Sequence, residues 1–468
     1  MKQAIHSKQL IIGLGKTGLS CAEYLNDQAI AFKAMDTRKV APFSEQISKL
    51  QQCELMLCGD PNQHLEAMDQ YLENISQIIV SPGVATTGAF FDLIREREIN
   101  IIGDIELFAR EVEAPVIAIT GSNGKSTVTQ LTGELLEAAG KNVLIGGNIG
   151  TPVLDLLKQA TPEYYVLELS SFQLETTTSL RPVAGTVLNL SRDHLDRYAS
   201  FEDYCAVKMS LLDACENIVV NKDEFPEPFE NSDLMKKNQI TIGLYQDSTA
   251  TENTTAAKID YSREQHEGGK FWINKAEQGL FLQEDLKIAG LHNVGNAMVS
   301  LALCSAVGVE FNVAIHEKLQ QFAGLKHRCQ FVGESQGVRF YNDSKATNVG
   351  ATIAALKGLA ETTSGELILI AGGDGKGADF TPLANIFKRY LSALVLLGQD
   401  AERLLQEAGS GIDSVKVDDM GQAVLAALKY AKAGDAVILA PACASFDMYS
   451  GFEQRGDVFT SQVEALVA

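Results

Sequence analysis

The sequence predicts an α/β protein with three domains, each built around a largely parallel β-sheet. Short Val-, Ile- and Leu-rich runs end at glycine or a small polar residue, and stretches with helical periodicity lie between most of them. This pattern is typical of parallel sheets covered on both faces, which bind ligands beyond the carboxyl ends of their strands. A chain of 468 residues is also too long for one hydrophobic core. The runs are LIIGLG, IIVSPG, VIAITG, VLIGGN, YVLELS, TVLNLS, LILIAGG, LVLLG and VILAPA.

The order of these runs predicts where the domains begin and end. Residues 1–103 open on a strand and a glycine turn, which predicts a Rossmann-like domain. Residues 104–324 contain a glycine-rich loop and predict a central domain like that of P-loop NTPases. Its stretch from about 225 to 285 is polar and β-rich, with KFWINKAEQGLFLQ alternating like a hairpin around Trp272. Strand and helix alternation resumes in residues 325–468, which predicts a Rossmann-like C-terminal domain.

Composition narrows the classes of partner. The chain has 39 basic and 60 acidic side chains, a formal charge of −21, which disfavours nucleic acid and anionic membranes as partners. Its eight cysteines form no C-x-x-C pair, as in reduced cytoplasmic proteins. The first residues run directly into a strand without a cleavage site, and no apolar run is long enough to span a membrane. We therefore expect a cytoplasmic enzyme.

The first glycine turn, GLGKTG, has the spacing of a dinucleotide fingerprint. Gly13, Gly15 and Gly18 follow a strand and open a helix, and Asp36 ends the next strand. A turn this tight lets any diphosphate approach the backbone, so a nucleotide-sugar diphosphate fits as well as a dinucleotide. A purely structural turn is the third reading. A second turn, Ser81-Pro82-Gly83, could line the same crevice.

The segment VIAITGSNGKST predicts a triphosphate-binding loop between a buried strand and a helix. Glycines free backbone N–H groups for phosphate oxygens, a lysine meets the β/γ charge, and a hydroxyl can bind Mg²⁺. The loop is a shortened variant, because Ile119 stands where the usual first glycine would be. An ordinary strand-to-helix turn is the alternative. The predicted loop residues are Gly121, Ser122, Asn123, Gly124, Lys125, Ser126 and Thr127.

An acidic residue follows the next buried run. In YYVLELSSFQLE, Glu168 comes near the end of a strand, where a carboxylate could hold the magnesium shared with the phosphates. The alternative is a strand-end acid facing solvent.

A lysine on an apolar helix face is a second unusual feature. Ser200 and Asp203 form a capping pattern, which predicts a helix from Phe201. On that helix Lys208 shares the face of Tyr204, Leu211 and Leu212. Such a lysine either extends to water or stays buried with a lowered pKa. A buried, neutral amine can react with carbon dioxide to give a carbamate that binds a second magnesium, with His194 as a neutral ligand beside it.

Taken together, the motifs resemble those of the Mur ligases, the ATP-dependent amide-forming enzymes of peptidoglycan precursor synthesis. The likeness is carried, in the family's order, by the phosphate loop, ELSSFQLE, DHLDRY, LHNVGN, HRCQF, NDSKATN, GGDGK and PACASFD. It covers all three predicted domains except the polar stretch, and it is greatest to the branch that adds D-glutamate.

The resemblance implies a role for each motif residue. Around uracil, diphosphate and the muramoyl group it implies Gly15, Thr17, Asp36, Thr37, Ser81, Gly83 and Asn148. For ATP it implies the phosphate loop with Asn293, Asn296, Arg328 and Asp343, and for the two metal ions Ser126, Glu168, His194 and carbamylated Lys208. The catalytic set is Lys125, Glu168, His194, Lys208, Arg328 and Lys345, and the incoming amino acid would meet Thr347, Lys376, Ser445 and Phe452.

The implied reaction joins D-glutamate to UDP-N-acetylmuramoyl-L-alanine through an acyl phosphate, with ATP and two Mg²⁺ ions, in a monomer. This reading favours a nucleotide-sugar diphosphate at GLGKTG over NAD. Three alternatives remain: a folylpolyglutamate-type ligase, which leaves the first domain without a purpose; a nicotinamide oxidoreductase, which leaves GSNGKST and NDSKATN unused; and a non-catalytic nucleotide-binding regulator.

Overall fold

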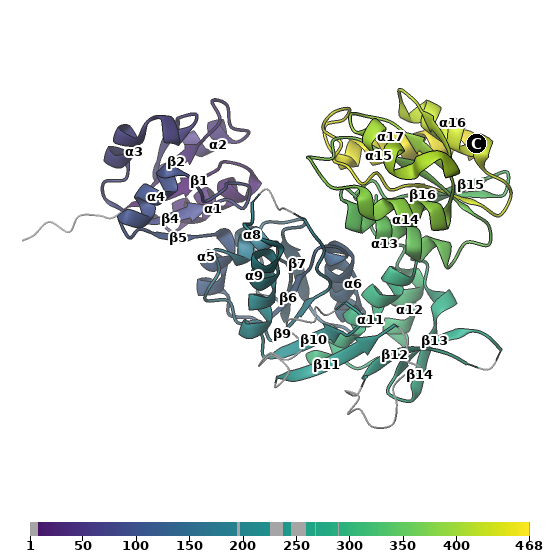
Figure 1. Cartoon of the computed structure of the whole chain (residues 1–468). Coiled ribbons are helices and arrows are strands. Elements are labelled where there is room, and N and C mark those ends of the chain that lie inside the picture. The colour runs from purple at the N-terminus through teal and green to yellow at the C-terminus, as the bar shows by residue number, and fades with distance from the viewer. Residues whose placement is uncertain are drawn as a thin grey trace, which may run out of the picture.

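Three β-sheets organise the chain, and helices cover them (Figure 1). The computed structural model describes residues 8–193, 197–224, 237–244, 259–266, 268–288 and 290–467. The sheets are built in chain order, so three α/β units follow one another, and the predicted α/β class is confirmed. Each of the nine apolar runs overlaps a strand, and these strands pair in parallel. The helices that connect parallel strands cover the faces of a sheet, which is why the strands are apolar throughout.

The first unit is a five-stranded parallel sheet in the order β3-β2-β1-β4-β5. The order changes direction between β1 and β4, and the two glycine turns follow these neighbouring strands, which opens a crevice at their carboxyl ends. Its strands are β1 (Lys8–Ile12), β2 (Phe32–Asp36), β3 (Cys53–Leu57), β4 (Ile75–Val80) and β5 (Asn100–Ile102). Its helices are α1 (Lys16–Asp27), α2 (Ser44–Ser48), η1 (Pro61–Gln63), α3 (Leu65–Tyr71) and α4 (Ala89–Glu96).

The central unit has nine strands in the order β14-β13-β12-β11-β10-β9-β6-β8-β7. The strands are β6 (Val116–Thr120), β7 (Val143–Gly147), β8 (Tyr164–Glu168), β9 (Ala184–Val187), β10 (Asn217–Asn221), β11 (Asn238–Gly243), β12 (Tyr261–Gln265), β13 (Phe271–Lys275) and β14 (Gln278–Leu282). The helices are α5 (Asp104–Glu111), α6 (Lys125–Ala138), α7 (Val153–Leu156), α8 (Ser171–Leu174), α9 (Phe201–Ala214), η3 (Gln283–Asp285), α11 (Leu291–Ala306) and α12 (Val313–Gln321). The predicted hairpin around Trp272 is confirmed by the antiparallel pair β13 and β14. Residues 225–236 and 245–258 of the polar stretch lie outside the described residues.

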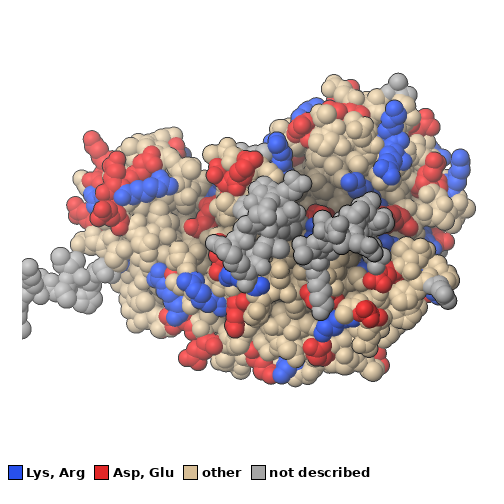
Figure 2. All heavy atoms as spheres, turned by 60° about the horizontal axis from the view of Figure 1, so that its bottom comes forward, with Lys and Arg blue, Asp and Glu red and all other residues tan. Residues whose placement is uncertain are grey.

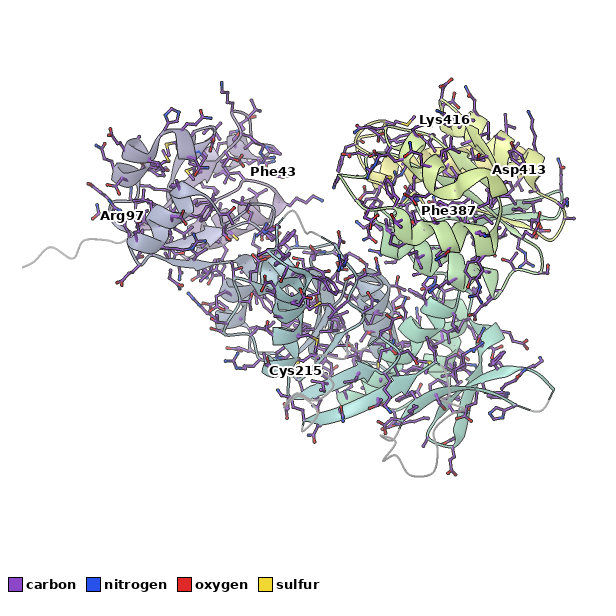
Figure 3. All side chains as sticks on the ribbon, viewed as in Figure 1. Phe43, Arg97, Cys215, Phe387, Asp413 and Lys416 are labelled. Atoms are coloured by element: carbon purple, nitrogen blue, oxygen red, sulfur yellow. The ribbon has the colours of Figure 1, made fainter. Side chains whose placement is uncertain are left out.

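The third unit is a six-stranded sheet in the order β15-β16-β20-β17-β18-β19, parallel except for the β15–β16 pair. Its strands are β15 (Gln330–Ser335), β16 (Val338–Asn342), β17 (Leu367–Ala371), β18 (Leu391–Leu396), β19 (Asp413–Lys416) and β20 (Ala436–Leu439). Its helices are α13 (Val349–Ala360), α14 (Thr381–Tyr390), α15 (Ala401–Ala408), η4 (Gly409–Gly411), α16 (Met420–Tyr430) and α17 (Phe452–Val467). Phe387 of α14 is fully buried in its core (Figure 3).

The surface carries both signs of charge. On the face shown in Figure 2, acidic and basic side chains are interspersed, with several acidic ones grouped over the first unit at the left. Among the described helices none is long and apolar enough to cross a membrane.

The first sheet ends at Ile102 and the third begins at Gln330, while the domain boundaries after residues 103 and 324 stay predictions.

Candidate functional site

The phosphate-loop segment joins the fully buried strand β6 to helix α6, as the sequence predicts. Gly124 precedes the helix with φ +83°, and a Cβ there would lie 2.8 Å from Asn296 Oδ1. Only glycine suits this backbone and this close approach. The Lys125 ammonium donates to the carbonyls of Gly121 (2.8 Å) and Ser122 (3.0 Å), so it lies folded over the loop.

Glu168 ends strand β8 directly beside this loop. Its side chain is buried, which rules out the solvent-facing alternative. Oε2 accepts a hydrogen bond from Ser126 Oγ at 2.5 Å, and Oε1 accepts one from Asn148 Nδ2 at 2.6 Å. A carboxylate facing a hydroxyl fits the preference of Mg²⁺ for hard oxygen ligands.

Lys208 lies buried behind the loop, with only 2% of its surface exposed, so it does not extend to water. Its amine donates to the Gly121 carbonyl at 3.0 Å and to Thr120 Oγ1 at 3.3 Å. Burial, and then the charge of Lys125, lowers its pKa well below the usual value. The predicted start of α9 at Phe201 is confirmed, because Ser200 Oγ accepts the Asp203 N–H.

One cavity, of about 60 Å³, lies where the central and third units meet. Arg328 crosses this boundary, and its Nη2 donates to Ser126 Oγ at 2.6 Å. Asn293 and Asn296 face the cavity from α11 and are hydrogen-bonded to each other at 2.9 Å. The predicted ATP residues that line it are Asn123, Gly124, Thr127, Asn293, Asn296, Arg328 and Asp343, together with Lys345.

A larger cavity, of about 620 Å³, lies between the first and central units. Its walls include both glycine turns of the first sheet and the segment after β7. All seven residues predicted for the UDP-linked substrate line it: Gly15, Thr17, Asp36, Thr37, Ser81, Gly83 and Asn148.

Asp36 is buried at one wall of this cavity, and its carboxylate is hydrogen-bonded within the protein. Its carboxylate accepts hydrogen bonds from the Leu14 N–H at 2.7 Å and from the Arg38 guanidinium at 2.7 and 2.8 Å. Although burial acts to raise the pKa of Asp36, these bonds hold it below its usual value. Asp36 therefore fixes the half-exposed Arg38 as a cation at the cavity.

Of the four residues predicted for the incoming amino acid, Thr347, Lys376 and Ser445 lie on loops that follow strands of the third sheet, and Phe452 begins helix α17. The backbones of Asp374 and Ala444 exchange two hydrogen bonds, at 2.8 and 3.0 Å, which aligns the loops carrying Lys376 and Ser445. The Ala442 N–H donates to the Ala346 carbonyl, beside Thr347. The Phe452 ring lies 3.8 Å from the Lys345 ammonium, in a cation–π contact.

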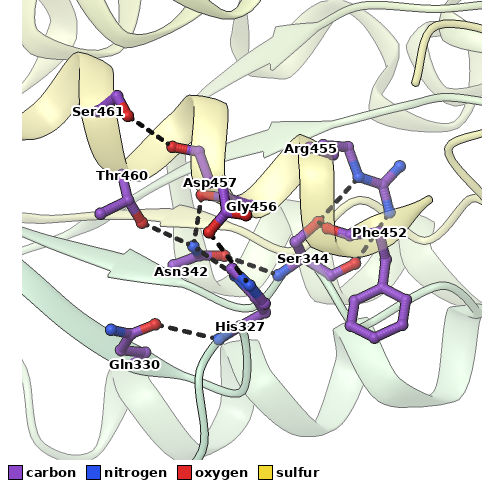
Figure 4. Close-up of polar contacts among 10 residues, drawn as sticks. All are labelled: His327, Gln330, Asn342, Ser344, Phe452, Arg455, Gly456, Asp457, Thr460 and Ser461. Carbon is purple, nitrogen blue, oxygen red and sulfur yellow. Dashed lines mark hydrogen bonds and ion pairs between the residues drawn. The ribbon is translucent and has the colours of Figure 1, made fainter. Parts of the chain in front are cut away.

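Helix α17 contacts the neighbouring segment that carries Asn342 and Ser344 (Figure 4). Asn342 Nδ2 contacts His327 Nδ1, the Gly456 carbonyl and Thr460 Oγ1 at 2.8 to 3.1 Å. Arg455, 2% exposed, donates to Ser344 and to nearby backbone carbonyls. The helix thus holds Asn342 and Ser344. The residues that follow each of them, Asp343 and Lys345, line the smaller cavity.

His194 falls in residues 194–196, outside the described part of the chain. Within the described part, no three His, Cys, Asp or Glu side chains cluster as metal ligands do.

Comparison with known proteins decides the family. The Mur ligase MurD-like N-terminal domain matches residues 7–103, the Mur ligase middle domain matches 119–304, and the Mur ligase glutamate ligase domain matches 327–443. The chain belongs to the Mur ligase family.

Its relatives match along the whole length. The UDP-N-acetylmuramoylalanine--D-glutamate ligase of Coxiella burnetii is 45% identical over 98% of this chain and 99% of its own. The ligase of the same name from Nitrosococcus oceani is 42% identical over 100% and 99% of the two chains. Among solved structures, a pseudomurein peptide ligase type C from Methanothermus fervidus covers 98% of this chain and 100% of its own. Its TM-score is 0.60 at 18% identity, which shows a shared fold.

Two residues at the cavities of this Mur ligase were missed from the sequence. His292, beside Asn293, lines the smaller cavity, and burial lowers its pKa to about 4, so it is neutral. Arg38, two residues after Asp36, lines the larger one. His292 stands inside the LHNVGN motif, so motif membership was an available signal, whereas Arg38 only follows the predicted Asp36 and Thr37. Packing shows that both residues line a cavity.

Proposed function

We propose that this Mur ligase joins D-glutamate to UDP-N-acetylmuramoyl-L-alanine at the expense of ATP, forming an amide in peptidoglycan precursor synthesis. The position of Glu168 between the two cavities carries the proposal. One of its oxygens is bonded to Asn148, which lines the larger cavity, and the other to Ser126, which Arg328 also contacts. A carboxylate substrate and a nucleoside triphosphate bound in these cavities would meet at Glu168.

The larger cavity suits a UDP-linked substrate. Glycine turns after β1 and β4 let a diphosphate approach the backbone, and Arg38 supplies positive charge in a chain whose net charge is −21. Asn148 lies between this cavity and Glu168, where it can hold the end of the substrate that reacts.

The residues around the smaller cavity, together with the phosphate loop, suit ATP. Asn293 and Asn296 would contact adenine, Asp343 the ribose, and Gly121 to Thr127 the phosphates. Lys125 would leave the carbonyls of its own loop for the β/γ-phosphates, and Arg328 reaches the same place from the third unit.

The chemistry begins with an oxygen of the substrate carboxylate attacking the γ-phosphorus, while the bond to the β-phosphate oxygen breaks and ADP leaves. This step is needed because a carboxylate has no adequate leaving group. Charge that develops on the transferred phosphoryl group would be stabilised by Lys125, Arg328 and Lys345.

The amine of D-glutamate then attacks the carbonyl carbon of the acyl phosphate. Phosphate leaves with the carbon–oxygen electron pair, and the amine loses a proton. Lys376, Thr347, Ser445 and Phe452 would hold the two carboxylates of D-glutamate, with lysine as the charged anchor.

We expect two Mg²⁺ ions at this site, where they would neutralise phosphate charge. Ser126 and Glu168 offer oxygen ligands for one. For the second, a carbamate on Lys208 would supply oxygens, and the burial and lowered pKa of that amine support its reaction with carbon dioxide. His194 would be a further ligand. A cytoplasmic monomer remains our proposal for the protein as a whole.

The alternatives fit less well. A folylpolyglutamate-type ligase or a nicotinamide oxidoreductase would leave one of the two cavities without an occupant. A non-catalytic regulator would not need Glu168 between them.

A phosphate-release assay tests the function directly. We expect release only with ATP, Mg²⁺, UDP-N-acetylmuramoyl-L-alanine and D-glutamate together. Release with folate substrates, or an absorbance change with NADH, would instead support one of the alternatives. A thermal-shift panel of D- and L-amino acids, with the nucleotide substrate present, tests the choice of D-glutamate.

A further inference from the structure

A buried carboxyl group lies at the junction of the first and central units, outside the reacting groups described above. Asp104 begins helix α5 directly after the last strand of the first sheet. It is 2% exposed, and α5 packs against α7 and α8 of the central unit. Its oxygen Oδ2 accepts a hydrogen bond from Gln173 Nε2 at 3.2 Å. Its other oxygen, Oδ1, is buried without a hydrogen-bond partner in the described structure.

Gln173 connects this carboxyl group to the substrate cavity, because Gln173 is one of the residues that line that cavity. Its amide oxygen accepts the Ser170 N–H at 3.1 Å, while its amide nitrogen donates to Asp104. The N–H of Ser170 can only donate and an ionised carboxylate can only accept, so the two neighbours select one orientation of the amide. The nitrogen carries a second N–H besides the one given to Asp104.

We propose that Asp104 is a positioning residue for the UDP-linked substrate, because together with Ser170 it holds the Gln173 amide so that the second N–H of that amide can donate to an acceptor oxygen of the substrate. The inference deepens the proposed function and rests on it. If Asp104 served only the start of α5, its negative charge would interact favourably with the positive end of the helix dipole. That role would not explain why an acid is buried with one oxygen unpartnered, an arrangement that disfavours folding.

The charged groups around Asp104 have other partners. On its own helix, Glu106 accepts hydrogen bonds from Thr178 and Ser179 and pairs with Arg110. On α7, Asp155 pairs with Lys158. A further titratable neighbour is the thiol of Cys21 on α1. Its pKa is raised, mainly by burial and then by the charges of Asp104 and Asp155. Burial raises the pKa of Asp104 itself to about 6, although the Gln173 bond and the backbone N–H groups of Ile105 and Asp104 oppose the shift.

Asp104→Ala and Asp104→Asn test the proposal, with Glu106→Gln as the matched control. Glu106 is equally buried and anchors the same junction, but it bonds residues 178 and 179 rather than Gln173. We expect Asp104→Ala to raise the KM for UDP-N-acetylmuramoyl-L-alanine about tenfold, with kcat and the KM for ATP within about threefold. Asp104→Asn should also raise this KM, because the amide of asparagine can donate as well as accept and so does not select one orientation of Gln173. The rise should be smaller than in Asp104→Ala, because asparagine keeps an oxygen that accepts from Gln173.

The pH dependence of the KM for the UDP substrate distinguishes a positioning role of Asp104 from a purely structural one. In the unmodified enzyme the KM for the UDP substrate should rise below about pH 6 as Asp104 takes up a proton, and this rise should be absent in Asp104→Asn. Glu106→Gln should lower the melting temperature and leave the KM for the UDP substrate within about twofold. Equal losses in Asp104→Ala and Glu106→Gln, or an unchanged KM in both Asp104 variants, would overturn the proposal.

Calorimetry with UDP-N-acetylmuramoyl-L-alanine alone gives a readout that does not need turnover. The loss of affinity in Asp104→Ala should match the rise in KM. If the unmodified protein binds this ligand but releases no phosphate with all substrates present, the proposed reaction fails while the role of Asp104 in binding is still tested. If either Asp104 variant does not fold, Asp104→Ser, which keeps an acceptor oxygen, replaces it in both measurements.

Discussion

Arg328 of the third unit lies 2.6 Å from the hydroxyl of Ser126 in the phosphate loop, although 202 positions separate them in the sequence. Ser126 is also bonded to Glu168, so a cation, a hydroxyl and a carboxylate from three distant segments meet at one point. The structure thus brings the predicted phosphate site and the predicted third-domain site together.

This contact predicts that Arg328→Ala loses at least about 100-fold in kcat/KM for ATP, because a cation at the transferred phosphoryl group is removed. Arg328→Lys should recover only part of the loss, since lysine keeps the charge but not the planar fork. Phosphate release measures both effects. Arg339→Ala, which removes an exposed arginine of β16, is the control and should behave as the unmodified enzyme. Full activity of Arg328→Ala would show that the contact has no role in phosphoryl transfer.

Lys208→Ala should nearly abolish ligation, since the carbamate oxygens are lost. Small carboxylic acids added to Lys208→Ala should restore part of the activity, because the shortened side chain leaves room for a carboxylate in the same place. Lys208→Met is the matched control: it fills the space and should not be rescued. Rescue is measured as phosphate release against carboxylate concentration. Absence of rescue, together with an unmodified amine in a high-resolution density map, would assign Lys208 a structural role.

The lowered pKa of Lys345 predicts that activity falls at alkaline pH. Burial, and then the nearby Arg328, lowers the pKa of its ammonium to about 8. A lysine with a lowered pKa is charged below that value and loses its charge as the pH rises through it. The kcat/KM for ATP should therefore fall above about pH 8 in the free enzyme.

In Lys345→Arg this alkaline fall should disappear, whatever the absolute activity, because arginine stays charged. Lys357→Arg, on an exposed position of α13, should keep the unmodified profile. An alkaline limb that persists in Lys345→Arg would mean that another group sets it.

Asp104 also predicts a change in stability with pH. Its pKa is raised from 3.8 to about 6 in the folded protein, so the folded state holds the proton more tightly than the unfolded chain. Its contribution to stability is therefore present below about pH 4 and is lost as the pH rises to about 6. Near neutral pH, Asp104→Asn should be more stable than the unmodified protein, by up to about 3 kcal/mol.

Thermal melts from about pH 4 to 8 check this, and the advantage of Asp104→Asn should shrink toward the acid end. A constant difference across that range would mean that Asp104 keeps the same charge in both states. A variant that is more stable yet binds its substrate more weakly would be a direct sign that Asp104 serves binding.

The sequence by itself determined the parallel sheets, the phosphate loop and the start of α9, because these depend on neighbours along the chain. Apolar runs, glycine spacing and the Ser200 cap act over a few residues, so their patterns can be read locally. The family resemblance then supplied which distant motifs belong together.

Only the tertiary structure decided how those motifs face one another. The burial of Lys208 and Glu168, the hydrogen bond from Leu14 to Asp36, and the hydrogen bond from Gln173 to Asp104 each depend on packing between separate segments of the chain. Local pattern leaves open whether a polar side chain faces water or the protein interior. Contacts between the units settle it, because a buried polar group is disfavoured unless a partner from another segment reaches it.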